Sequence, residues 1–200
     1  MLRLLLLVLL LAGLPARAQD APTPASEAAP AFEVAEAFVV QGFRLADEVP
    51  PGSAVGRAGL RYADGGYVHV VHGKPYVRGR QVYGGLVGYD AVWAAGAHRA
   101  TEFVTTVPLT FGDTRVEPGA YSLFVTPGRD RWTLHVNRAL GMHLADEYDP
   151  ALDVVTVDVA PETLTTPVEG LTWSFADDGT ALRLAWADVA IAVPFQRAAP

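Results

Sequence analysis

The sequence contains no cysteine and a single lysine, Lys74, among its 200 residues. The lack of cysteine excludes disulfides and thiolate metal ligands, so a folded domain must be held by its apolar core alone. The chain carries 15 basic and 22 acidic residues, for a net charge of −7. Nucleic-acid binding requires clustered Lys and Arg, whereas the longest basic cluster is Arg78-Gly79-Arg80. We therefore exclude nucleic acid as a partner.

One long apolar run is present, and it lies at the N-terminus. It extends from the residue after Arg3 to Leu14 and is followed shortly by Ala16-Arg17-Ala18. A basic start, an apolar stretch and small residues before a cleavage point are typical of a secretory signal peptide. The run is too short for a membrane-spanning helix, which needs about 20 apolar residues. The sequence predicts that residues 1–18 are cleaved, and that the product resides in the periplasm or outside the cell with no membrane span.

The rest of the chain divides into two short leading segments and one domain. Residues 19–31 are rich in Ala and Pro and predict a flexible linker. Residues 32–51 form an N-terminal extension whose apolar residues lie near helical spacing, which allows one short helix. The domain itself is predicted to cover residues 52–197.

From residue 55 onward the apolar residues recur with a period of two. Residues 55–61 and 67–72 flank Asp64-Gly65-Gly66, a strong turn signal, and predict a hairpin. Short alternating stretches separated by Gly and Pro favour an all-β fold, an antiparallel β-sandwich of jelly-roll-like arrangement. We expect about nine or ten strands. The others are predicted at residues 103–107, 109–111, 121–126, 132–137, 155–159, 171–175, 182–186 and 189–195.

Three of the four tryptophans fall on the faces of these strands that should point inward. Trp132, Trp173 and Trp186 are therefore predicted to lie together in the core between the sheets. The fourth, Trp93, lies outside any regular strand and is a candidate platform for a ligand.

Motifs for metal binding and for nucleophilic catalysis are missing. His69 and His72 are three residues apart, so on a strand they face opposite sides and cannot share a metal ion. No Gly-x-Ser-x-Gly elbow is present. The acidic residues within 146–153 lack the spacing of a calcium loop and are interpreted as a solvated loop, after a short helix or irregular excursion at 138–148. We predict no metal site and no cofactor, and the sequence assigns no catalytic residue.

The segment Lys74–Thr101 is the most unusual part of the domain. It contains five glycines, three tyrosines and Trp93, and it has no clear period. Long irregular connections in compact domains are often functional. The alternative is a structural loop around one end of the sandwich, with Arg80 bonding backbone carbonyls. The composition leaves both interpretations open.

Four stretches carry a resemblance to a known family. Lys74–Val87 contains Arg-Gly-Arg and Tyr-Gly-Gly-Leu-Val, and Val92–Thr101 begins Val-Trp. Residues 117–124 read Glu-Pro-Gly-Ala-Tyr-Ser-Leu-Phe, and Trp132–Asn137 reads Trp-Thr-Leu-His-Val-Asn. Together they resemble the domain of unknown function 2911 (DUF2911) family of exported bacterial proteins, from about Gly52 to Phe195. The resemblance implies export and fold, because the function of the family is not known.

Two departures from the family pattern remove polar groups. Ala94-Ala95 stands where the family shows Arg-Thr, and His98-Arg99 stands where it shows Asn-Glu. If the family site uses those groups, this chain is inactive or altered. The polar residues that it retains are Arg80, Thr101, Tyr121 and Asn137.

We expect a monomeric binding domain for a small-molecule, glycan or peptide ligand of the cell envelope. A concave site with aromatic walls and a few polar groups is the usual form of such a site. One alternative is a hydrolase that uses His98, or a loop carboxylate such as Asp90, as a base. Another is a structural envelope protein that binds partners through sheet edges. The residues predicted to bind the ligand are Arg80, Tyr83, Trp93, His98, Thr101 and Asn137.

Overall fold

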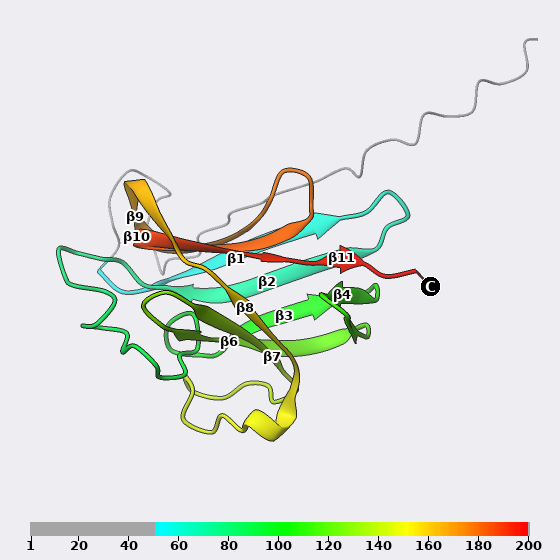
Figure 1. Ribbon diagram of the computed structural model, residues 1–200, viewed down its shortest axis with the longest axis horizontal. Coiled ribbons are helices and arrows are strands. Elements are labelled where there is room, and N and C mark those ends of the chain that lie inside the picture. The colour runs from blue at the N-terminus through cyan, green and yellow to red at the C-terminus, as the bar shows by residue number, and fades with distance from the viewer. Residues whose placement is uncertain (1–50, 200) are drawn as a thin grey trace, which may run out of the picture.

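The computed structural model describes residues 51–199 (Figure 1). This part of the chain is all-β, as predicted, with eleven strands and one short 3-10 helix. The predicted signal peptide, the linker and the short helix before residue 50 lie outside the described residues. The elements are β1 (Ala54–Arg61), β2 (Tyr67–Lys74), β3 (Thr101–Thr105), β4 (Leu109–Phe111), β5 (Thr114–Val116), β6 (Gly119–Pro127), β7 (Trp132–Asn137), η1 (Pro150–Leu152), β8 (Asp153–Val159), β9 (Glu162–Phe175), β10 (Ala181–Pro194) and β11 (Gln196–Arg197).

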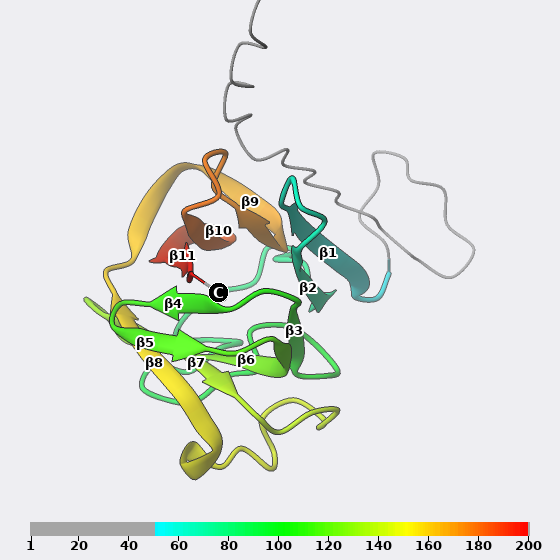
Figure 2. The same ribbon diagram turned by 90° about the vertical axis from the view of Figure 1, so that its right-hand side faces the viewer.

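The strands form three antiparallel sheets that enclose one core. Six of them hydrogen-bond in the order β1-β2-β3-β6-β7-β8, β9 pairs with β10, and a small third sheet has the order β11-β4-β5. Figure 2 shows the β9–β10 ribbon across from β6 and β7, with β1 and β2 closing one side and β8 the other. The predicted hairpin is present, with Arg61 paired to Tyr67. The predicted antiparallel β-sandwich is confirmed.

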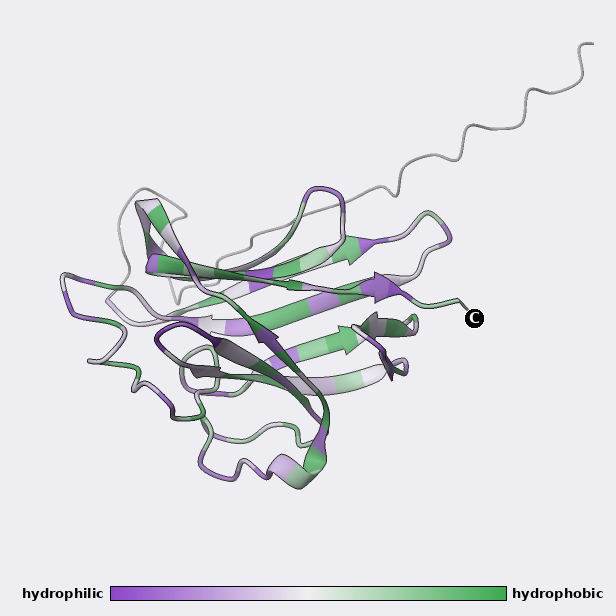
Figure 3. Cartoon of the chain, viewed as in Figure 1, coloured by the Kyte–Doolittle hydropathy of each residue, from purple (hydrophilic) through white to green (hydrophobic). Residues whose placement is uncertain are grey.

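The core lies between these layers and contains the three predicted tryptophans. Trp132, Trp173 and Trp186 are 2%, 0% and 2% exposed and come from β7, β9 and β10. Figure 3 shows apolar and polar residues alternating along the strands that face this core. The alternation buries every second side chain, because successive side chains of a strand point to opposite faces of the sheet. The prediction that the three indoles meet in a dry interior is confirmed.

Strand β10 contains a change of phase in its apolar pattern. Its buried residues are even-numbered from Leu182 to Trp186 and odd-numbered from Ile191 onward. The change occurs around Ala187, whose φ is 53°, and the pairing with β9 shifts register on both sides of this residue. The register places the extra residues on β9, because Ala185 pairs with Thr172 whereas Val189 pairs with Thr163. The two strands predicted at 182–186 and 189–195 are thus one strand whose burial pattern changes phase near Ala187.

Two short strands and half of a long one are not among those predicted. The strands are β5 and β11, and the half is the first part of β9, where none of residues 162–169 is buried. A pattern of alternate burial is missing in these stretches, so periodicity gives no signal there.

The outer face of the six-stranded sheet carries a second, small apolar cluster. Residues 138–148 are irregular and contain no helix, and they lie over Phe124 on this face. Phe124 is fully buried there together with Ala94, Ala100 and Met142. Within residues 51–199 there is no helix of the length and hydropathy needed to cross a bilayer.

Candidate ligand-binding cleft

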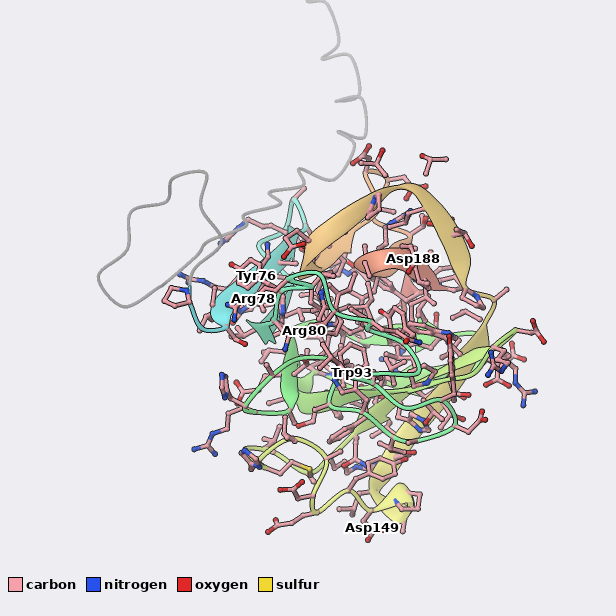
Figure 4. The ribbon with its side chains drawn as sticks, turned by 90° about the vertical axis from the view of Figure 1, so that its left-hand side faces the viewer. Tyr76, Arg78, Arg80, Trp93, Asp149 and Asp188 are labelled. Atoms are coloured by element: carbon pink, nitrogen blue, oxygen red, sulfur yellow. The ribbon has the colours of Figure 1, made fainter. Side chains whose placement is uncertain are left out.

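Arg80 has a structural partner on the chain itself. Its guanidinium donates to the carbonyl of Tyr76 at 2.6 Å and to that of Val77 at 3.1 Å. Figure 4 shows Tyr76, Arg78 and Arg80 together on the same stretch of the segment. The side chain remains exposed, and its contacts are those of a residue that fixes a loop conformation.

Trp93 and Thr101 belong to the frame of the sandwich. Trp93 continues the sheet beside β6, where its backbone exchanges two hydrogen bonds of 2.9 Å with Val125, and its ring stacks on Trp186 at 5.8 Å. Thr101 is fully buried and donates to the carbonyl of Ala95 at 2.9 Å, which also accepts the ring N–H of Trp173 at 3.0 Å. Both residues hold the irregular segment against the core.

His98 lies apart from the other predicted residues. It is exposed with a φ of 68°, and it borders a cavity of about 260 Å³ on the outer side of β1 and β2, beside Val55 and Glu102. Its ring forms no hydrogen bond with any residue that the structure describes. No carboxylate in the described part of the chain therefore orients this imidazole.

Tyr83 is the one predicted residue that lines a cleft with both aromatic and charged walls. The cleft has a volume of about 140 Å³ and lies at one end of the sandwich. It is formed where the irregular segment meets the β6–β7 turn, the start of β9 and the part of β10 that follows Ala187. The other lining residues are Tyr89, Gly128, Arg129, Trp132, Pro161, Glu162, Thr163 and Val189.

The hydroxyl of Tyr83 has no hydrogen-bond partner among the residues that the structure describes. The residue is 7% exposed, and its ring packs edge-on against Trp132 at 4.8 Å and Trp186 at 6.3 Å. Burial, together with the negative charge of Asp188, raises the pKa of the Tyr83 phenol. Within residues 51–199 the only other buried polar side-chain atoms without a partner are Ser122 Oγ and the ring nitrogen of Trp186. A buried donor left unpaired costs about 1–3 kcal/mol, so this orphan hydroxyl needs an explanation.

The rim of the cleft carries charges of both signs. Arg129 lies over the ring of Tyr89, with its guanidinium carbon 4.8 Å from the ring centre. Glu162 forms an ion pair with Arg183. Gly128 is required at the β6–β7 turn, because a β-carbon there would lie 2.3 Å from the carbonyl oxygen of Arg131. The turn therefore holds the exposed Arg129 at the mouth of the cleft.

Asn137 lies in a different place, beneath the excursion that follows β7. It is fully buried, and its amide nitrogen donates to the carbonyl of Asp149 at 2.9 Å and to Asp153 Oδ1 at 2.8 Å. Its oxygen accepts the backbone N–H of Ala139 at 2.9 Å. Figure 4 shows Asp149 at one end of this side of the molecule and Asp188, which neighbours the cleft, at the other. Asn137 thus belongs to a second polar site.

This second site is a cluster of polar side chains, of which the sequence analysis predicted Asn137 alone. We call Thr126, His135, Asn137, Tyr148 and Asp153 the His135 cluster. Its members approach one another at hydrogen-bond distance, and burial together with Asp153 raises the pKa of the Tyr148 phenol. They come from two strands, a loop and a third strand, and the register of β7 with β8 shifts beside Asn137. No motif spacing could have indicated this set.

Comparison with known proteins assigns the chain to a family. A family profile described as "Protein of unknown function (DUF2911)" matches residues 58–195. The chain belongs to the DUF2911 family. The match contains every residue of the cleft and of the His135 cluster, and it confirms the resemblance stated from the four sequence stretches. No curated protein and no solved structure matches this DUF2911 chain.

Proposed function

We propose that this DUF2911 protein is an exported, monomeric domain that binds a small or extended envelope ligand, such as a glycan or a peptide, in the cleft beside Tyr83. The observation that carries the proposal is the orphan hydroxyl of Tyr83, a buried donor on a residue that lines the cleft. A bound ligand that offers an oxygen acceptor would give this hydroxyl its missing partner.

The chemistry of the walls supports a ligand that is partly apolar and partly polar. The rings of Tyr89 and Trp132 offer flat surfaces on which a sugar ring or an aromatic side chain can pack. Arg129 and Glu162 provide a cation and a carboxylate at the rim. A few fixed polar groups among aromatic walls are the usual composition of a small-ligand site. Loops at the end of a rigid β-sandwich are also where binding residues concentrate.

The test is a binding screen with a variant that removes a single oxygen atom. A panel of envelope oligosaccharides and peptidoglycan fragments is titrated into the purified protein and followed by calorimetry. Tyr83→Phe keeps the ring in the core and deletes only the unpaired hydroxyl, so stability should stay the same or rise by up to about 1 kcal/mol. Affinity for the ligand should nevertheless fall about tenfold, which corresponds to the loss of one hydrogen bond.

Tyr67→Phe is the matched control, because Tyr67 is 39% exposed and does not line the cleft. This variant should bind the ligand as the wild type does. A panel in which no compound binds would contradict the proposal. Binding to Tyr83→Phe at wild-type affinity would contradict it as well.

A further inference from the structure

Three side-chain donor atoms of the His135 cluster lie at the corners of a small triangle. His135 Nδ1 is 3.0 Å from Asp153 Oδ2, and the hydroxyl oxygen of Tyr148 is 2.6 Å from the same carboxylate oxygen. The Tyr148 oxygen is 3.1 Å from His135 Nδ1. Each of the three atoms therefore approaches both of the others.

Such a triangle has the dimensions of one face of a metal coordination sphere. Nitrogen and oxygen ligands lie about 2.0–2.2 Å from a first-row transition-metal ion. Adjacent ligands at that radius and at right angles are about 3 Å apart. An ion placed above the triangle could therefore contact all three donors with little movement of the side chains, and its opposite face would stay open.

His135 and Asp153, the two proposed ligands on strands, are each oriented by a further hydrogen bond. The other ring nitrogen of His135 is 2.9 Å from Thr126 Oγ, and the second oxygen of Asp153 accepts the amide of Asn137 at 2.8 Å. Metal-binding histidines and carboxylates typically use their remaining polar atom in this way, which fixes the orientation of the ligand. The ring of Tyr148 is held by edge-on contacts with Phe124 at 5.0 Å and with His135 at 5.6 Å.

We propose that His135 Nδ1, Tyr148 Oη and Asp153 Oδ2 form a three-donor binding site for a first-row transition-metal ion, with Fe³⁺ as the best match. Imidazole, carboxylate and phenolate are hard to borderline ligands and contain no sulfur. Among the described residues no three His, Cys, Asp or Glu side chains gather in a way that could hold a metal. Here Tyr148 is the third ligand, beside His135 and Asp153.

The protons of Tyr148 and His135 can be assigned both without and with a bound metal ion. Without metal, the triangle is satisfied when Tyr148 donates its hydroxyl proton to Asp153 and His135 donates from Nδ1, while Nε2 accepts from Thr126. With metal, the Tyr148 proton leaves to solvent, and the His135 proton lies on Nε2 and is donated to Thr126 Oγ. Thr126 accepts or donates equally well, because a hydroxyl rotates to suit its partner.

The site can be reached from solvent and is surrounded by negative charge. The side chains of His135 and Asp153 are 12% and 10% exposed. The preceding excursion carries exposed carboxylates at Asp146, Glu147 and Asp149. An acidic approach of this kind attracts cations.

The experiment adds ferric iron, as its citrate complex, to the purified protein after treatment with a chelator. A tyrosinate ligand to Fe³⁺ produces a visible charge-transfer absorption, so the wild type should turn coloured with one equivalent of iron. Tyr148→Phe keeps the aromatic contacts and should lose the colour while its circular dichroism remains that of the wild type. Asp153→Asn keeps an oxygen for the amide of Asn137 but replaces the acceptor that faces His135 and Tyr148 with an NH₂ donor, and it should weaken iron binding at least tenfold. Tyr67→Phe, which alters an exposed tyrosine on β2, should retain the colour.

Two results would overturn the assignment. The first is a failure of metal binding: Fe³⁺, Cu²⁺ and Zn²⁺ all fail to bind to the folded wild type, or the coloured complex persists in Tyr148→Phe.

The second is catalysis without metal. Thr126, His135 and Asp153 place a hydroxyl, an imidazole and a carboxylate in the order that is also found in hydrolases. Metal-independent cleavage of p-nitrophenyl acetate that disappears in Thr126→Ala would assign this cluster to catalysis instead. The Tyr83 cleft is a separate site, so neither result bears on the proposed ligand-binding function.

Discussion

Gly56 and His72 face each other across the β1–β2 pair, and the His72 ring occupies the space where a side chain at Gly56 would lie. A β-carbon at Gly56 would be 2.2 Å from Nε2 of His72. Because the imidazole is only 3% exposed, it cannot move aside into water. The glycine and the buried histidine therefore form one packing unit.

We predict that Gly56→Ala destabilises the domain by about 1–3 kcal/mol, since the added methyl group overpacks the contact with His72. Chemical denaturation followed by tryptophan fluorescence measures the change. Gly52→Ala is the control, because a β-carbon at Gly52 would have no atom within 4 Å. The control should change stability by less than about 0.5 kcal/mol. Equal stability of the two variants would show that the ring can be displaced.

Burial of His72 also predicts a pH dependence of stability. Loss of hydration lowers the pKa of this imidazole from 6.5 to about 4. The unfolded chain binds a proton below pH 6.5, whereas the folded chain does so only near pH 4. The stability contributed by the neutral ring is therefore complete above pH 6.5 and is lost as the pH falls from 6.5 toward 4, by up to about 3 kcal/mol.

This pH dependence is measured as the free energy of unfolding at pH 7 and pH 4.5. In His72→Gln the fall between the two pH values should be smaller by about 2 kcal/mol, because the titrating group is gone. His69→Gln is the comparison, since His69 lies on the more exposed face of the same strand. If wild type and His72→Gln lose the same stability over this range, the buried imidazole is not the cause.

Arg129 should contribute to ligand binding without supporting the fold. It packs over Tyr89 at the mouth of the cleft and is exposed. Arg129→Ala should reduce affinity for the cleft ligand about tenfold and change stability by less than about 0.5 kcal/mol. Arg131, in the same turn, pairs with Asp158 at 3.5 Å and does not line the cleft. Calorimetry should show that Arg131→Ala binds the ligand normally, and equal losses in the two variants would indicate a general charge effect.

Asn137 should act as the anchor of the excursion. Its buried amide makes three hydrogen bonds that join β7 to residues 139, 149 and 153. Asn137→Ala leaves these groups unpaired and should cost about 2–4 kcal/mol. Hydrogen exchange should accelerate within residues 138–152, with little change in β1 and β2. Thr133→Ala, which removes an exposed hydrogen bond to Asp158, should leave the exchange of the excursion unchanged.

Much of the fold follows from the sequence because burial alternates along the strands. Trp132, Trp173 and Trp186 occupy the interior as their positions predict. Stretches with no buried face, such as residues 162–169, give no such signal, although backbone pairing places them in a strand. The periodicity of apolar residues indicates which side chains are buried. Backbone hydrogen bonds can extend a strand past the last buried side chain, where this periodicity is absent.

The candidate sites were harder to predict for a geometric reason. Of the residues chosen from the irregular segment, Tyr83 lines the cleft. Trp93 instead pairs with Val125 of β6, and Thr101, in β3, bonds the carbonyl of Ala95. Arg129 and Glu162 reach the same cleft from connections distant in sequence. His135 and Asp153 meet only because β7 and β8 are neighbours with a shifted register. Contacts between residues this far apart in the chain leave no recognisable motif spacing in a single sequence.

The change of phase near Ala187 determines which side chains in the second half of β10 face the core. Removing this one residue would reverse the facing of everything that follows it, so that Ile191, Val193 and Phe195 would turn outward. Val189, which borders the cleft, would be displaced as well. An insertion or deletion of one residue near Ala187 would therefore remove these side chains from the core of the sandwich.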